Sequence, residues 1–431
     1  CFTIFFNFRW NNRIHSPSVV FTPQRYYFIG KSLNFLYICR KIIDMKLLIV
    51  LSRFPYPLEK GDKLRAYNQI RILSQSHDIY LAAFSDRKVS SGAIKELKQY
   101  CKSIRVFKLN FVGRLIQMVR FFFKGLPFQC AYFYNRRAHN QFLRFVDEVK
   151  PDHLYCQLVR TAEYTKNVAV KKTLDYQDVL SKGMHRRCEV APFYLKPLFK
   201  MEYERLRRYE NEIFDYFDHK TIITGVDRDL LPHSQNEQIH VIANGVDFSC
   251  YSHTESQKKY DLIFSGNMSY APNVEAAEFI VKSIFPKLKE EFPALRLVLC
   301  GAHPSFKVLA LKREGVTITG WVDSMADYYA QSRIFLAPMH IGTGLQNKLL
   351  EAMAMKLPCV TSPLAGKPLE GIREGKEILI CNSVTGYIEA IKFLLDNPDQ
   401  YVEIAENGYR FVKEHYNWEA TTSKLRTILE E

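Results

Sequence analysis

Short apolar runs alternate with helical segments along most of this chain, and this alternation limits the fold more than any other feature. From Met45 the sequence reads as a strand, a loop, a helix through Ser74 and a second strand, over KLLIVLS, RFPYPLEKGDKLR and DIYLAAFS. Further runs follow at SIRVFKLN, DHLYCQLV, KKTLDYQ, KTIITGV and IHVIANGV. Buried strands separated by helices predict a parallel sheet covered by helices.

The alternation restarts after a polar stretch at 249–259. Its strands are expected in YDLIFSGNM, LRLVLCG, VTITGWV, RIFLAPM and LPCVTSP, with one helix over NVEAAEFIVKSIFPKLKEEF. A chain of 431 residues is too long for one ordinary core. We therefore expect an α/β protein with two Rossmann-like domains, at 45–250 and 251–431, and a final helix around Trp418–Glu430 that crosses back to the first.

Residues 1–44 precede the first expected strand and lack a helical or strand period. We interpret this stretch as upstream sequence that is not native to the protein, with Met45 as the true start. The alternative is an ordered extension or a signal-like anchor. Basic residues on both sides of its short apolar runs do not fit a signal peptide.

The formal net charge of +15 narrows the choice of partners, and +10 remains when residues 1–44 are left out. Such a surface attracts phosphates, nucleic acids or anionic lipids. We expect no nucleic-acid partner, because no binding motif occurs and the basic residues do not form one block. The ten cysteines show no CxxC spacing, which favours reduced thiols in the cytoplasm over a disulfide frame or a zinc site. No uninterrupted apolar run fits a bilayer.

The most informative stretch is 340–354, HIGTGLQNKLLEAMA, directly after the expected strand RIFLAPM. A strand, a glycine turn and a helix start place free backbone N–H groups where a diphosphate can bind. Lys348 would add a positive charge, and Glu351, one helical turn on, lies on the same helix face. A carboxylate there can accept hydrogen bonds from both hydroxyls of a ribose. The alternative is an ordinary solvated helix pair.

The string GTGLQNKLLEAMAMKLPCVTS resembles the nucleotide-binding motif of family 4 glycosyltransferases, also called group 1 glycosyltransferases. The resemblance extends to SGNMSYAPNVEA, to GWVDSMADYYAQSRIFLAP, to the turn at 244–247 and to the early loop FPYPLEKGDKLRAYN. These anchors keep the family's order and spacing over 45–431. The subgroup that the chain most resembles is the bacterial exopolysaccharide and exosortase-associated sugar transferases.

The resemblance implies a GT-B fold, in which two Rossmann domains face each other across a cleft. It also implies transfer of a hexosyl group with retention of anomeric configuration and with no metal or other cofactor. Of the two glutamates eight positions apart that family members carry, Glu351 matches the second, and Thr343 occupies the place of the first. Backbone N–H groups of 342–345 are then expected to take over contacts to the donor sugar.

Further site residues are carried over on matching positions. Gly266 and Asn267 follow the first strand of the second domain, where a small residue lets the backbone approach a pyrophosphate; a plain turn glycine is the alternative. Trp321 and Val322 are expected to line the base, unless the tryptophan belongs to the core. The full set of expected donor-site residues is Gly266, Asn267, Trp321, Val322, Gly342, Thr343, Gly344, Leu345 and Gln346, with Lys348 and Glu351 as the catalytic candidates.

In the first domain, Gly61 and Arg65 are expected on the loop after the first strand, facing the cleft; the alternative is a tight turn with a solvated arginine. Asp175 and Asp178 end a strand and can orient an acceptor hydroxyl, or simply act as caps. CQLVRTAEY occupies the region where many relatives carry a histidine, so no general base is assigned. In a retaining reaction the departing phosphate can accept the proton, and the protein stabilises the leaving diphosphate.

The stretch GRLIQMVRFFFKGLPFQCAYFYNRR interleaves basic and aromatic residues, as interfacial membrane helices do. It predicts peripheral contact with an anionic membrane at the inner face of the plasma membrane, and the alternative is a core-facing helix with a basic outer side.

Together these features predict a cytoplasmic glycosyltransferase that moves a sugar from a nucleotide sugar to a saccharide or lipid-linked acceptor in cell-surface polysaccharide synthesis. Two alternatives remain: a sugar-nucleotide 2-epimerase of the same fold, and a non-catalytic nucleotide-sugar sensor. A nicotinamide dehydrogenase is disfavoured, because a proline-rich loop replaces GxGxxG after the first strand.

Overall fold

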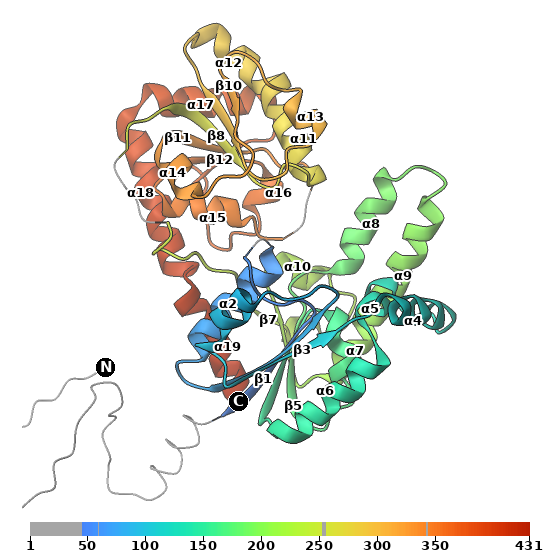
Figure 1. The fold of residues 1–431 in the computed structure, drawn as a ribbon. Helices are drawn as coiled ribbons and strands as arrows, with labels where there is room; N and C mark the ends of the chain where they lie inside the picture. The colour runs from blue at the N-terminus through green and yellow to red at the C-terminus, as the bar shows by residue number, and fades with distance from the viewer. Residues whose placement is uncertain (1–44, 59, 252–255, 342–343) are drawn as a thin grey trace, which may run out of the picture. The chain divides into compact units, whose positions relative to one another are not determined.

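The computed structural model describes residues 45–58, 60–251, 256–341 and 344–431. The interpretation of residues 1–44 lies outside this range. Within it, the chain from Met45 onward builds two parallel sheets with helices around each (Figure 1). The prediction of an α/β fold with two parallel-sheet halves is thereby confirmed.

The first sheet, within the described residues, has seven strands in the order β3-β2-β1-β4-β5-β6-β7, all parallel. This is the doubly wound order, which reverses direction next to β1. The strands β1 and β4 at the centre are almost fully buried, and residues 47–51 of β1 form the continuous apolar run that such burial favours. The strands are β1 (Lys46–Leu51), β2 (Asp78–Ser85), β3 (Ser103–Lys108), β4 (His153–Gln157), β5 (Lys171–Asp175), β6 (His219–Ile222) and β7 (His240–Val241).

Helices fill the connections of the first sheet. They are α2 (Gly61–Leu73), α3 (Ser91–Lys98), α4 (Phe111–Phe123), α5 (Phe128–Phe133), α6 (Arg136–Val149), α7 (Ala162–Thr165), α8 (Leu180–Val190), α9 (Lys196–Ile213) and α10 (Gly225–Leu230), with short 3₁₀ turns η1 (Val159–Thr161), η2 (Phe214–Tyr216) and η3 (Asn236–Gln238).

The second sheet repeats the same order as β10-β9-β8-β11-β12-β13 within the described part of the chain. Its strands are β8 (Tyr260–Ser265), β9 (Leu297–Cys300), β10 (Val316–Ile318), β11 (Ser332–Ala337), β12 (Cys359–Thr361) and β13 (Leu379–Ile380). Its helical segments are α11 (Ala271–Phe279), the π-helix η4 (Ile280–Ile284), α12 (Phe285–Glu291), α13 (Phe306–Leu309), α14 (Met325–Ala330), α15 (Asn347–Ala354), α16 (Pro363–Gly366), α17 (Val384–Asp396) and α18 (Pro398–His415).

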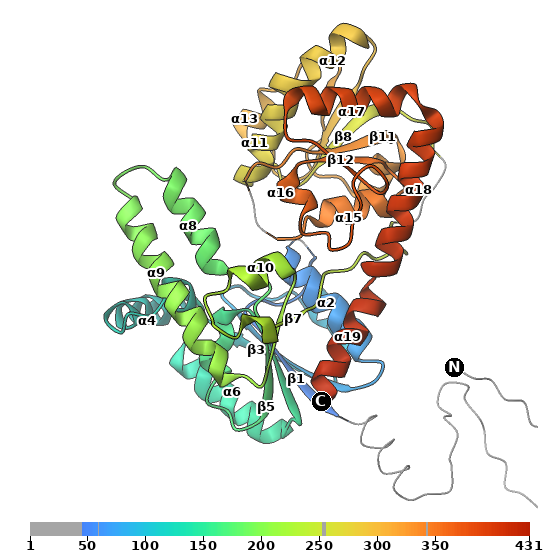
Figure 2. The same ribbon diagram turned by 180° about the vertical axis from the view of Figure 1, so that it is seen from behind.

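The last helix, α19 (Trp418–Glu430), packs on the first sheet although it follows α18 of the second. Leu425 and Leu429 belong to the same apolar cluster as Leu47 of β1 and Ile70 of α2. Figures 1 and 2 show α19 beside α2 in both views. At the start of α19 the backbone approaches so closely that a Cβ on Gly245 would lie 2.4 Å from the Trp418 nitrogen, so only glycine fits there.

The sequence predictions for four single elements were wrong. The helix expected over 273–292 is interrupted by the π-turn η4 just before Pro286, because proline lacks the N–H group of a continuous helix and clashes with the preceding turn. The last strand of the first sheet is only two residues long, and the short edge strand β13 was missed. The loop expected as far as Arg65 ends earlier, since α2 already begins at Gly61.

None of the helices in the described ranges combines the length and the apolar character that crossing a bilayer requires.

Candidate functional site

The site in the second half lies at the carboxyl ends of β8 and β11, the edge where doubly wound sheets bind ligands. Gly266 and Asn267 follow β8, and the loop at 338–346 connects β11 to α15. Gly266 has a φ of +150°, and a Cβ there would lie 2.6 Å from Asn273 Nδ2. This φ and the contact with Asn273 both favour glycine at position 266.

Asn273 connects this glycine turn to the start of α15. Its Nδ2 donates to the Asn267 carbonyl at 2.9 Å, and its Oδ1 accepts from Lys348 Nζ at 2.6 Å. The Lys348 ammonium also lies 4.6 Å from the centre of the Phe264 ring. Burial lowers the pKa of Lys348 to about 7, an effect that the negative charge of Glu351 only partly offsets. An anionic ligand would restore the charged form of this lysine.

Glu351 lies one turn after Lys348, in a setting that disfavours its charge. Burial raises its pKa to about 7, against the opposing effects of its tyrosine hydrogen bonds and of Lys348. The Tyr329 hydroxyl donates to Glu351 Oε2 at 3.1 Å, and Tyr251 also bonds this carboxylate. Two titratable groups of opposite sign with strongly shifted pKa values, side by side at a sheet edge, are typical of a functional site.

The start of α15 carries no side-chain cap, since the Gln346 side chain accepts no hydrogen bond from the first turn. Its backbone N–H groups are the positive end of the helix and suit an anion. Gly344 precedes this helix with a φ of +68°, a conformation that favours glycine. Leu345 packs against the hydrophobic core around the second sheet. The predictions for Gly342 and Thr343 fall outside the described residues.

Trp321 and Val322 lie in the turn after β10. Trp321 is 69% exposed, so the alternative of a core tryptophan is wrong. Val322 packs against the hydrophobic core around the second sheet. Their contact with a base stays a prediction. Among the residues that the structure describes, no three His, Cys, Asp or Glu side chains converge as metal ligands.

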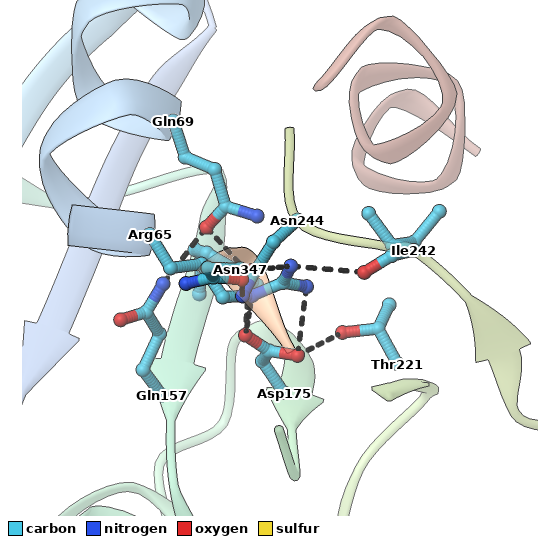
Figure 3. A network of polar contacts seen from close by, with 9 residues as sticks. Arg65, Gln69, Gln157, Asp175, Thr221, Ile242, Asn244 and Asn347 are labelled. Carbon is cyan, nitrogen blue, oxygen red and sulfur yellow. Dashed lines mark hydrogen bonds and ion pairs between the residues drawn. The ribbon is translucent and has the colours of Figure 1, made fainter. Parts of the chain in front are cut away.

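The expected placement of Arg65 on a cleft-facing loop was wrong. Arg65 lies in α2 with its side chain fully buried, and its Nε and Nη2 donate to the two Asp175 oxygens at 2.7 and 3.2 Å. A third nitrogen donates to Ile242 and Asn244. Figure 3 shows Arg65 and Asp175 pointing at each other inside this network. With both partners buried and paired, Asp175 is not placed to orient an acceptor hydroxyl either.

The same network leads to α15. Asn244, which bonds Arg65, also donates to Asn347 Oδ1 at 3.3 Å, and Asn347 is the first residue of α15 (Figure 3). Gly61, by contrast, has open space where a Cβ would be, so no close approach requires glycine there. The structural role of Arg65 was hidden from the sequence because its partners lie 110 to 179 positions away.

Asp178 lies beyond the carboxyl end of β5 and does reach the α15 loop. A Cβ on Gly344 would lie 2.9 Å from Asp178 Oδ1 and 3.7 Å from Asp227 Oδ2. Burial, and then the charge of Asp227, raise the pKa of Asp178 to about 6. A cavity of about 60 Å³ adjoins Asp227 and Gly344, and its lining also includes Arg186, Gln346 and Lys367.

Sequence reasoning missed Asp227, Asn273, Tyr251 and Tyr329. Asp227 follows Thr224 at the spacing of a helix cap, and its backbone N–H does donate to Thr224 Oγ1 at 3.0 Å. Thr224 Oγ1 also donates to the Asp227 carboxylate at 2.6 Å. The cap pattern therefore concealed a second role. Asn273 and Tyr329 lie in stretches that carry the family resemblance, but no pattern there indicates their bonds to Lys348 and Glu351.

Solved structures of similar fold identify the architecture of the chain. The chain superposes on sucrose-phosphate synthase from Thermosynechococcus elongatus with a TM-score of 0.64 at 14% identity, over 89% of this chain and 98% of that one. It also superposes on HepE from Anabaena in complex with UDP and glucose, with a TM-score of 0.63 at 12% identity, over 89% and 99% of the two chains. These likenesses show the fold, which is GT-B as predicted.

Residues 259–397 match the family model described as glycosyl transferases group 1. This part of the chain is therefore similar to a group 1 glycosyltransferase domain, and the predicted resemblance is confirmed there. An uncharacterized 44.6 kDa protein in the cps region of Klebsiella pneumoniae is 23% identical over 403 residues, 88% of this chain and 98% of that protein. The exopolysaccharide and exosortase-associated subgroup stays a prediction.

Proposed function

We propose that this protein is a glycosyltransferase that transfers a hexosyl group from a nucleotide sugar to a saccharide or lipid-linked acceptor. The observation that carries the proposal is the joint placement of Lys348 and Glu351 beside the Gly266 turn, with both pKa values moved to about 7. The group 1 family match supports it, as does the similarity in fold to HepE, whose structure holds UDP and glucose.

In this proposal the donor diphosphate binds at the uncapped start of α15. Lys348 supplies the positive charge, and Asn273 keeps its ammonium near the Gly266 turn. Glu351 in its ionised form accepts hydrogen bonds from the ribose hydroxyls, in competition with Tyr329. Charge-assisted bonds of this kind contribute about 1.5 to 3 kcal/mol each.

Transfer with retention then needs no protein base. The bond between the anomeric carbon and the diphosphate oxygen breaks, and an acceptor oxygen bonds the same carbon on the same face. The acceptor proton passes to the departing phosphate oxygen, whose negative charge Lys348 and the α15 N–H groups stabilise. Asp178 and Asp227, which lie next to Gly344, are the side chains proposed to hold the acceptor hydroxyl.

The cps-region relative supports a role in cell-surface polysaccharide synthesis. We place this step in the cytoplasm, where nucleotide sugars are made, with no metal and no other cofactor required. A retaining transferase differs from the epimerase alternative in requiring an acceptor before the sugar leaves the donor.

The first test is thermal stability of the protein with UDP, GDP, ADP or CMP, beside the variant Glu351→Ala. Ligand at about 100 times its dissociation constant adds roughly 2.7 kcal/mol to folding stability. We expect a rise in melting temperature with one nucleotide, lost in Glu351→Ala and kept in Glu290→Ala, an exposed glutamate of α12 in the same half. No rise with any nucleotide, in folded protein, would refute the site.

A second measurement addresses catalysis. With the nucleotide sugar whose base gave the shift, release of the nucleoside diphosphate should depend on an added acceptor extract. Release of an isomerised free sugar without acceptor would favour the epimerase, and binding without any turnover would favour the sensor.

A further inference from the structure

The helix α4 presents its apolar side to solvent. Seven of its large apolar side chains are exposed, from 42% for Phe122 to 82% for Phe123, and Gln117 and Phe121 are its buried contacts with the rest of the fold. The exposed set repeats every three to four residues, so it forms one helix face. It comprises Phe111, Val112, Leu115, Ile116, Val119, Phe122 and Phe123, which we call the α4 face.

This orientation contradicts one of the two sequence interpretations of the segment. A core-facing helix with a basic outer side is wrong, because the apolar residues are outermost. Monomeric proteins rarely expose apolar patches of this kind without a binding role. Figures 1 and 2 show α4 beside α9, where Arg205 lies over the Phe122 ring at 4.8 Å and holds the end of the helix in place.

The charge around the α4 face is mainly positive, although Arg114 of α4 forms an ion pair with Asp86 at 3.1 Å. Between Glu96 and Asp147 the sequence contains ten Lys or Arg residues and no Asp or Glu. Arg120 and Lys124 are exposed on α4 itself. Arg136 and Arg137 are exposed at the start of α6, which the bond from Asn135 Nδ2 to Asn110 Oδ1 at 3.1 Å ties to the start of α4.

An apolar helix face with a basic surround matches an anionic bilayer surface, which offers an apolar interior beneath negative head groups. A second copy of this chain fits less well, because a symmetric contact would bring the same exposed basic residues, Arg120 and Lys124, against each other. We propose that the α4 face is a membrane-docking surface that inserts into the cytoplasmic leaflet of an anionic membrane.

The α4 face lies at the same sheet edge as the proposed acceptor site. α4 begins directly after the carboxyl end of β3, and Arg160, which follows β4, donates to Gln129 of α5 at 2.9 Å. The electrostatic neighbours of Arg160 include Asp178. Docking through α4 would hold this edge at the membrane and present Asp178 to a lipid-linked acceptor. That consequence rests on the proposed function, whereas docking itself does not.

The test is co-sedimentation of the full chain with phosphatidylcholine vesicles, with and without phosphatidylglycerol. We expect binding that requires phosphatidylglycerol and weakens as salt is added. The variant Ile116→Gln/Val119→Gln/Phe123→Gln removes three apolar groups of the α4 face without changing charge. It should lower the vesicle partition coefficient at least about tenfold, which corresponds to 1.4 kcal/mol.

Equally exposed apolar residues elsewhere provide the control. Phe306 and Leu309 on α13 and Val402 on α18 are 87%, 51% and 57% exposed. Their triple replacement by Gln should leave vesicle binding unchanged. Equal losses in the two triple variants, or no binding by the unaltered chain, would overturn the proposal.

Two further readouts distinguish lipid docking from self-association and from a defect in nucleotide binding. Light scattering that shows a dimer, dissociated by the α4 variant and indifferent to vesicles, would assign the face to a second copy and refute lipid docking. The nucleotide-induced rise in melting temperature should persist in the α4 variant. Its absence from the unaltered chain would count against the proposed function and leave the docking result standing.

Discussion

The buried pair of Arg65 and Asp175 allows a sharp prediction about stability. Replacing Arg65 by Met removes two hydrogen bonds to the Asp175 carboxylate and two more to a backbone carbonyl and an asparagine side chain. Asp175 retains the hydroxyls of Tyr155 and Thr221 but loses its cation. Because a buried charge is left without its partner, the expected cost is roughly 3 to 5 kcal/mol.

Calorimetric melting temperatures measure this cost. For a domain of this size about 2 °C corresponds to 1 kcal/mol, so we expect Arg65→Met to lower the melting temperature by at least about 6 °C. The control is Arg105→Met, which breaks the pair between Arg105 Nη2 and Glu148 Oε2 at 2.6 Å with both side chains about half exposed. Such surface pairs contribute about 0 to 1 kcal/mol.

A double variant tests whether the cost comes from the unpaired charge. Arg65→Met with Asp175→Leu removes both charges, and an apolar pair of similar volume is often tolerated, so most of the lost stability should return. A double variant less stable than Arg65→Met, or equal effects of Arg65→Met and Arg105→Met, would refute the assignment of Arg65 to a buried structural pair.

Three further predictions concern the site. Binding of the nucleoside diphosphate at pH 8 should be accompanied by the uptake of close to one proton, because Lys348 in the free protein, with a pKa of about 7, is then mostly neutral. Titration calorimetry in two buffers of different ionisation enthalpy measures this proton uptake. Proton uptake that persists in Lys348→Met would contradict the assignment to this lysine. The folded state raises the Glu351 pKa from 4.5 to about 7, so this carboxyl lowers stability as pH rises through that interval. The difference in free energy of unfolding between Glu351→Gln and the unaltered protein should therefore change by roughly 1 to 3 kcal/mol in favour of the variant from pH 5 to pH 8. A difference in melting temperature that does not depend on pH would contradict this assignment. Gly344→Ala should lower the free energy of unfolding by about 1 to 2 kcal/mol, because of the left-handed φ at this position and the contact with Asp178. The loss should be smaller in Gly371→Ala, since Gly371 has a φ of +83° but open space around it. Equal losses of stability in thermal unfolding would show that the contact with Asp178 is unimportant.

Local sequence patterns identified most of the fold. Apolar runs with helices between them predicted the parallel strands, since a strand buried on both faces must be apolar throughout. The pattern failed where a strand is too short to show a period, as at Leu379–Ile380, and where a proline inside an apolar helix forces a π-turn.

The residues of the candidate site also differ in whether the local sequence could identify them. Lys348 and Glu351 were identified because both lie on one helix turn after a glycine loop, within a single stretch of sequence. Asn273, which holds Lys348, comes from a different helix 75 positions away, and Asp227 reaches Gly344 from the first half of the chain. Contacts between distant segments leave no periodic signal in a single sequence.

The sequence by itself determined the two Rossmann halves, the glycine turn before α15 and the basic, aromatic character of α4, because these depend on neighbours a few residues apart. Tertiary structure alone decided which way these elements face. It buried Arg65 against Asp175, turned the apolar side of α4 outward and brought Asp178 to Gly344. An amphipathic helix has the same sequence whether its apolar side meets a core or a solvent-exposed edge, and only packing settles which one occurs.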